Sequence, residues 1–323
     1  MSTLSPASIA QAAPAPEAPA ERAGRRSRGR LGRGRDGVTA YLMIAPMVVL
    51  LGIFVVWPLC YSFYLSTFKI SFYQPSEFVG LDFYKYVLTS SGFWKALGVG
   101  LYYTFLTVPA ELVLSLLLAT FIKTLSGKVA AFVKTTVYLP AVVSTVIAAV
   151  IFVFMYQDQG VTNWLIGFVS AGPVDWLNDP DTALPSIAVA GIWLRFGLTT
   201  LILLAGLLDI PQAYYEAAAL DGAGYLRRTF SITIPLLKNV VLYLLVTECT
   251  LAIQMFDLPL VMTNGGPVDA TVTPNLYIFN RFRDFTPYAT SFSLAASLLL
   301  FIVLGLISLV IFRLVNSDKS VDG

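Results

Sequence analysis

A few ionisable or strongly polar residues interrupt the long apolar stretches of this chain. Charged side chains inside a bilayer usually face the interior of a helix bundle or a water-filled cavity. These positions therefore predict either contacts with a polar ligand or hydrogen bonds and ion pairs between helices. An ion pair between Arg195 and Asp257 is one such pairing, and both interpretations stay open. The candidate ligand-contacting residues are Arg195, Glu248, Gln254, Phe256 and Asp257, with Glu111 as a further deep carboxyl group.

Phe256 precedes Asp257, and either helix packing and the interfacial aromatic belt or a ligand explains such an aromatic residue. Apolar rings next to polar groups suit the faces and hydroxyls of a sugar. Glu248 and Asp257 are nine residues apart, so in one helix they mark different depths.

Other chemistries are excluded by residues that the chain lacks. It has no histidine, which excludes a Ser-His-Asp triad and histidine-ligated zinc. Its two cysteines, Cys60 and Cys249, have no metal-like spacing and are interpreted as packing residues. A Gly-rich phosphate loop of the Walker type is also missing. We expect no catalytic residues, no metal and no cofactor, and any energy from a nucleotide must come through a partner.

Composition predicts a polytopic membrane protein. Hydrophobic residues make up 57% of the chain, charged residues only 12%, and the mean hydropathy is +0.74. Six apolar segments are long enough to cross a bilayer, which takes roughly 20 residues. The predicted fold class is all-α with six transmembrane helices. The segments are residues 41–63, 97–122, 132–156, 184–208, 236–262 and 288–315.

The distribution of Lys and Arg predicts the orientation. Cytoplasmic loops carry an excess of these residues. With the N-terminus inside, 15 of the 21 Lys and Arg lie in cytoplasmic tails and loops, and five lie outside. Both termini are therefore expected in the cytoplasm.

The two tails differ from the rest of the chain. Residues 1–37 combine an Ala/Pro/Ser/Gln stretch with seven arginines, which predicts a disordered cytoplasmic tail that binds anionic lipid headgroups. A nucleic-acid-binding arm and a cleaved signal peptide are both disfavoured, since lipid lies next to this tail and the first span is too long for a signal. The other expected parts are a six-span domain over residues 38–318 and a short tail over 319–323.

A polar island separates two of the apolar segments. Residues 212–220 are strong helix formers after Ile210-Pro211, Gly222 and Gly224 allow a sharp turn, and residues 225–232 can resume as a helix before Pro235. This pattern predicts a rigid helix–turn–helix lying across the cytoplasmic membrane face. A docking surface explains such rigidity, and an ordinary amphipathic connector is the alternative.

The island resembles the EAA motif of permease subunits in bacterial ATP-binding-cassette importers. The motif is carried by Glu216-Ala217-Ala218, Gly222 and then Ile232, Ile234 and Pro235, with Ile234 where leucine is commoner. Other segments resemble the carbohydrate-uptake branch of that family, and the likeness runs from about Val38 to the end. These are residues 78–84 (FVGLDFY), 139–140 (LP), 205–207 (AGL) and 256–267, which end in TNGGP.

The resemblance implies a type I importer permease fold in the bacterial cytoplasmic membrane. The loop at 209–235 would hold a coupling helix that docks on an ATPase. The implied partners are a second homologous permease, two copies of a cytoplasmic ATP-binding subunit and an extracytoplasmic sugar-binding protein. A di- or trisaccharide is the expected cargo. The implied coupling residues are Glu216, Ala217, Ala218, Asp221, Gly222, Arg227 and Pro235.

Two positions depart from the family pattern. Glu248 stands where an uncharged residue is usual, and Ser115 replaces a frequent glycine. Glu248 is therefore either specific to the substrate or a buried protonated acid in a helix contact.

Two other transport functions stay open. A glycerol-phosphate or polyol importer would let Arg195 meet a phosphate. A proton-coupled carrier would use Glu111 and Glu248 as a proton relay, but it leaves the island unexplained and the sequence shows no internal repeat.

Overall fold

The computed structural model describes residues 35–70, 76–168, 172–284, 286 and 288–316. The predicted basic tail up to residue 34 and the tail over 319–323 lie outside these residues. The chain divides into two compact units, residues 1–58 and 59–323. The first contains α1 (Arg35–Leu51) and a π-helical turn (Gly52–Val56).

Helix α2 (Trp57–Ser66) leads into a short hairpin of β1 (Phe68–Lys69) and β2 (Glu77–Phe78), which pair antiparallel with Phe68 opposite Phe78. After it come α3 (Asp82–Thr89), α4 (Ser91–Lys123), α5 (Gly127–Val142), α6 (Thr145–Met155), α7 (Val161–Ile166) and α8 (Pro180–Asp209). The second half contains α9 (Gln212–Leu220), α10 (Tyr225–Arg228), a π-helical turn (Thr229–Thr233), α11 (Ile234–Leu236), α12 (Lys238–Ile253), α13 (Asp257–Met262), α14 (Pro274–Arg283) and α15 (Ala289–Asn316).

Five segments of the described chain are helical, long and apolar enough to cross a membrane, and a bent pair of helices makes up to six. The five segments are Tyr41–Ser66, Ser91–Lys123, Pro180–Asp209, Lys238–Met262 and Ala289–Leu314. The prediction of a helical membrane protein is confirmed.

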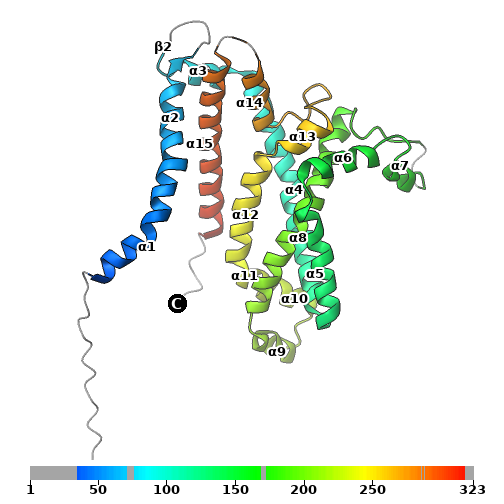
Figure 1. The fold of residues 1–323 in the computed structure, drawn as a ribbon. Coiled ribbons are helices and arrows are strands. Elements are labelled where there is room, and N and C mark those ends of the chain that lie inside the picture. Colours follow the sequence, from blue (N-terminus) through cyan, green and yellow to red (C-terminus); the bar gives the residue numbers. More distant parts are fainter. Residues whose placement is uncertain (1–34, 71–75, 169–171, 285, 287, 317–323) are drawn as a thin grey trace, which may run out of the picture. The chain divides into compact units, whose positions relative to one another are not determined.

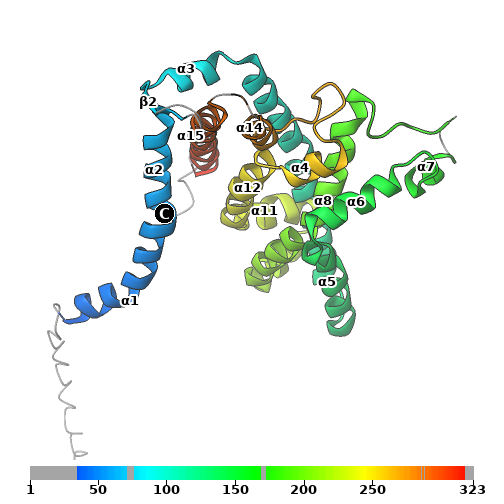
Figure 2. The same ribbon diagram turned by 45° about the horizontal axis from the view of Figure 1, so that its top comes forward.

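The third predicted span is not one straight helix, as Figure 2 shows. Its two parts, α5 and α6, meet at an angle of 95°. Val143 and Ser144 between them are extended. Pro140 lies just before this break and supplies no backbone N–H, which weakens the last turn of α5. The fifth predicted span is also interrupted, because Gln254 to Phe256 separate α12 from α13.

The core of the second unit forms around α4 and α8, which pack along each other. One buried apolar cluster joins α4, α6, α8 and α13, and includes Tyr103, Phe152, Ile187 and Leu258. A second cluster lies toward the other end of α4 and α8 and includes Ile122, Leu203 and Leu237. In Figure 1, α9 and α10 lie at the end of the bundle opposite to α13 and α14.

Gly197 of α8 packs directly against the backbone of α5. A Cβ atom at this position would overlap the carbonyl oxygen of Val137. Because a backbone oxygen cannot rotate away, Gly197→Ala is expected to push α5 from α8 and to lower the Tm of the purified protein by roughly 5 °C. Gly98→Ala is the matched control, since a Cβ atom there meets nothing within 4 Å. Equal Tm values for the two variants would contradict this packing.

Candidate functional site

The island folds as the sequence predicts, with α9 spanning Gln212–Leu220. Gly222 has a φ of +73°, a left-handed conformation that favours glycine. The N–H of Gly222 donates to the carbonyl of Ala219 at 3.1 Å, and that of Ala223 to the carbonyl of Ala218 at 2.9 Å. These two bonds form a Schellman motif, which ends α9 in a fixed geometry. The second helix is shorter than predicted, because Thr229–Thr233 forms a π-helical turn.

Four side chains tie the island together and to the bundle. Arg228 Nε donates to the carbonyl of Ala223 at 2.7 Å, and the hydroxyls of Tyr215 and Thr233 lie 3.1 Å apart. Lys123, at the end of α4, donates from Nζ to the carbonyl of Leu207 at 2.9 Å and lies 4.7 Å from the centre of the Tyr215 ring. Lys123 is one of the 15 basic residues that the sequence assigns to the cytoplasmic side. Its contacts make the island a rigid extension of α4 and α8.

The outer surface of the island is open. No residue of α9 is buried, and Leu220 is 90% exposed. Tyr225, Leu226 and Phe230 of the island are exposed as well, and so is the carboxylate of Glu216. A rigid surface that combines exposed apolar groups with a carboxylate is typical of a protein interaction site. Most of the predicted coupling residues belong to it: Glu216, Ala217, Asp221, Gly222, Arg227 and Pro235 are exposed, and Ala218 is half-buried.

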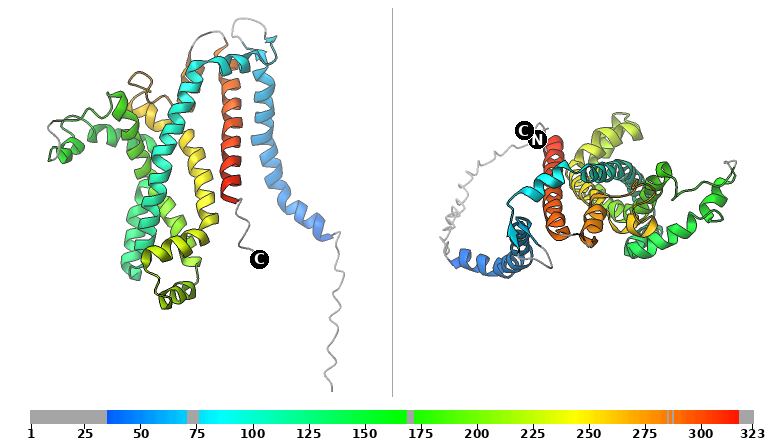
Figure 3. Two further views of the ribbon diagram at one scale, coloured as in Figure 1. Left: turned by 180° about the vertical axis from the view of Figure 1, so that it is seen from behind. Right: turned by 90° about the horizontal axis from the view of Figure 1, so that it is seen from above.

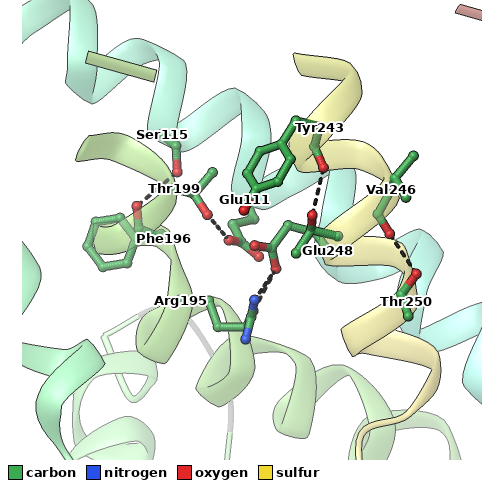
Figure 4. A network of polar contacts seen from close by, with 10 residues as sticks. Glu111, Ser115, Arg195, Phe196, Thr199, Tyr243, Val246, Glu248 and Thr250 are labelled. Carbon is green, nitrogen blue, oxygen red and sulfur yellow. Dashed lines mark hydrogen bonds and ion pairs between the residues drawn. The ribbon is translucent and has the colours of Figure 1, made fainter. Parts of the chain in front are cut away.

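A polar cluster lies inside the bundle, where α4, α8 and α12 meet (Figure 4). Arg195 of α8 binds Glu248 of α12, with both Nε and Nη2 at 2.6 Å from Oε2. Thr199 donates its hydroxyl to Glu111 of α4, and Ser115 donates to the carbonyl of Phe196 at 3.0 Å. The prediction of an ion pair between Arg195 and Asp257 is therefore wrong, because the guanidinium of Arg195 pairs with Glu248.

Burial makes this cluster a strong connection between helices. The side chain of Glu248 is 5% exposed and that of Arg195 is 31% exposed. Glu111 is buried, and its carboxyl group interacts electrostatically with both Glu248 and Arg195. Because charges in a low-dielectric interior need partners, Glu248 of α12 depends on Arg195 of α8, and Glu111 of α4 depends on the hydroxyl of Thr199 of α8.

The remaining candidate ligand-contacting residues lie elsewhere. Gln254 ends α12, and its Nε2 donates to the carbonyl of Thr250 at 3.2 Å. The Phe256 ring lies edge-on to Phe279 with centroids 4.9 Å apart. Asp257 is exposed at the start of α13. The five residues therefore form two groups rather than one site. Among the described residues, no group of His, Cys, Asp and Glu is arranged to hold a metal ion.

This architecture is that of a multi-pass helical membrane protein. Residues 78–321 match the family described as binding-protein-dependent transport system inner membrane component. The chain belongs to this family.

Known relatives and a solved structure agree. The chain is 36% identical over 246 residues to the trehalose/maltose transport system permease protein MalF of Thermococcus litoralis, covering 75% of this chain and 83% of that protein. It is 33% identical over 253 residues to the sulfoquinovosyl glycerol transport system permease protein SmoG of Agrobacterium fabrum, covering 77% and 82%. Its fold is similar to a bacterial ABC transporter involved in alginate import, with a TM-score of 0.74 at 23% identity over 88% of this chain and 97% of that chain. The type I importer permease fold is thereby confirmed.

Proposed function

We propose that this chain is the permease subunit of an ATP-driven sugar importer and forms one half of a heterodimeric translocation pathway. The main observation behind this proposal is helix α9, which is exposed, ends in a fixed Schellman geometry and has Glu216 at its surface. A rigid, exposed surface with apolar groups and a carboxylate suits a docking partner. Closure of two ATPase subunits bound to α9 and its equivalent would rock the two permeases between inward and outward access.

The proposed assembly follows from the family and from the charges. A second permease and two ATPase copies complete the transporter, and an extracytoplasmic binding protein delivers the sugar. Both termini and α9 face the cytoplasm, as the excess of Lys and Arg favours. The basic tail over residues 1–37 binds anionic lipids beside the permease domain over 38–318.

A di- or trisaccharide is the proposed cargo. The two named relatives are permeases of a trehalose/maltose and of a sulfoquinovosyl glycerol transport system. Inside the bundle, the guanidinium of Arg195 already pairs with Glu248. An anionic glycerol phosphate would have to displace Glu248, so the glycerol-phosphate importer is the second candidate. Gln254, Phe256 and Asp257 are proposed to contact the sugar, and Arg195 with Glu248 to position the helices around it.

Uptake competition tests this function. Cells that express the chain with its neighbouring transport genes are given a labelled disaccharide and an excess of trehalose, maltotriose, a polyol or glycerol phosphate. Competition by the oligosaccharides and dependence on ATP are expected. Uptake that collapses with an uncoupler while ATP is held constant would instead indicate the proton-coupled carrier.

Asp257→Asn is expected to raise the KM of uptake about tenfold without changing the amount of assembled complex. Asp257 is exposed at the start of α13, so losing its charge removes a ligand contact and leaves the packing intact. Asp284→Asn, which removes a carboxylate paired with Arg281 at 3.7 Å, is the control. Failure of Asp257→Asn to assemble would give Asp257 a structural role.

A further inference from the structure

A mainly apolar groove that also contains amide and hydroxyl groups runs along the bundle where α12, α14 and α15 meet. It consists of two neighbouring cavities of about 390 Å³ and about 430 Å³, a size typical of ligand sites. Asn275 of α14 and Ser297 of α15 line both cavities, Phe256 lines the first and Gln254 the second. Figures 1 and 3 show α12 and α15 side by side. We name this pair of cavities the 254–297 groove.

The groove extends along most of a membrane-spanning helix. Its residues on α15 recur every three or four positions and so share one face of the helix. From Thr290 to Ser308 this face rises about 27 Å at 1.5 Å per residue, close to the thickness of the hydrocarbon core, roughly 30 Å. The lining residues on this face are Thr290, Ser293, Ser297, Phe301, Gly305 and Ser308.

The polar groups of the groove are unsuited to lipid. Asn275 Nδ2 donates to the carbonyl of Gln254 at 2.9 Å, and Gln254 Nε2 donates to the carbonyl of Thr250. Within the part of the chain that the structure describes, these contacts use the amide nitrogens and leave both amide oxygens as free acceptors. An amide acceptor without a donor is costly in hydrocarbon. The groove must therefore meet water or a ligand that donates hydrogen bonds.

Aromatic rings decide between a sugar and a packed helix. Phe256 and Phe279 form an edge-on pair at one end, Phe301 is 59% exposed and Phe282 is 57% exposed. Close helix packing in membranes uses small residues that let two backbones approach, and α15 offers Ser293, Ser297 and Gly305. The four phenylalanines that also line the groove are large, and they keep the backbone of a second helix away from these small residues. Rings beside amide and hydroxyl groups instead suit the apolar faces and hydroxyls of a sugar.

We propose that the 254–297 groove is a wall of the sugar pathway, with Gln254 and Asn275 accepting hydrogen bonds from sugar hydroxyls and Phe256 and Phe301 contacting the ring faces. This inference rests on the proposed function and adds α14 and α15 to the pathway. Glu248 extends from α12 toward Arg195 of α8, and neither residue lines the groove.

Cysteine accessibility tests the groove. The parent is the complete transporter, with its ATPase, second permease and binding protein, in which this chain carries Cys60→Ser and Cys249→Ser. Ser297→Cys probes the groove, and Ile302→Cys, an exposed position on α15 outside both cavities, is the matched control. During ATP turnover, a membrane-impermeant methanethiosulfonate is expected to modify Ser297→Cys at least tenfold faster and to stop uptake.

The outcomes separate this inference from the proposed function. Protection of Ser297→Cys in the complete transporter, with modification only in the isolated chain, would show that a helix of the second permease covers the groove and would overturn the inference. Absence of sugar-stimulated ATPase activity in the parent with trehalose, maltotriose or raffinose would instead overturn the sugar function itself. As a second readout, Gln254→Met keeps the side-chain length but removes the amide, and is expected to raise the KM of uptake about tenfold at unchanged assembly. An unchanged KM would overturn the role of Gln254.

Discussion

Gly222→Pro is expected to abolish coupled transport, with uptake falling at least about 100-fold while insertion into the membrane stays normal. Proline fixes φ near −65°, whereas Gly222 has a φ of +73° and donates its N–H to Ala219. The substitution therefore destroys the Schellman motif that ends α9. With α9 misdirected, ATP-driven closure no longer moves the bundle. Uptake and binding-protein-stimulated ATPase activity of the reconstituted transporter measure this loss.

Gly224→Pro provides the matched control two residues away. Gly224 has a φ of −68° and precedes α10, so its backbone already suits proline. A Cβ atom meets nothing within 4 Å at either glycine, so the two variants differ in backbone conformation rather than in crowding. Near-normal transport by Gly224→Pro is expected. Near-normal transport by Gly222→Pro would overturn the docking role of the island.

Glu216→Arg tests the same surface through its charge. Glu216 is exposed, so the change leaves the fold intact but replaces an anion by a cation at the proposed contact with the ATPase. Like charges placed opposite each other weaken an interface strongly, and co-purification of the ATPase is expected to drop at least tenfold. Unchanged co-purification would place the contact elsewhere on the island.

Removing one partner of the Arg195–Glu248 pair is expected to have the second large effect. Glu248→Leu leaves a guanidinium without its carboxylate between α4, α8 and α12, and breaking a buried pair in this way costs about 3–5 kcal/mol. The amount of folded protein recovered in detergent should fall severalfold. Size-exclusion chromatography with fluorescence detection measures it.

The double variant Arg195→Met/Glu248→Leu separates structure from transport. Replacing both charges by apolar groups removes the unpaired ion, and such replacements are often neutral for stability. If the pair only positions the helices, the double variant is expected to assemble and to take up sugar within about tenfold of the unmodified protein. Recovered assembly without uptake would instead place the pair in contact with the sugar.

Sequence predicts local structure well where residues close together in the chain determine that structure. The bounds of α9 and the turn at Gly222 follow from helix formers between Pro211 and two glycines, and the structure has both. The sequence predicts the third span only as one apolar segment, residues 132–156, because hydropathy measures length and polarity but not direction. Its 95° bend depends on how α5 and α6 each pack against α8 and α13.

The candidate ligand-contacting residues were predicted less well. Depth can be counted from sequence, but the face of a helix that each residue occupies in a bundle cannot. The sequence therefore leaves Arg195 free to pair with Asp257, whereas the structure pairs it with Glu248 between α8 and α12. Asn275, Ser297 and Lys123 were missed because amide and hydroxyl groups are common, and only contacts between distant segments single them out.

The most direct test of the account is the ATPase activity of the purified complex in nanodiscs, with its binding protein, across oligosaccharides, polyols and glycerol phosphates. The account predicts that an ATPase co-purifies and that di- or trisaccharides stimulate it, while Gly222→Pro removes the stimulation. A chain that purifies without any ATPase, and whose uptake follows the proton gradient, would contradict it.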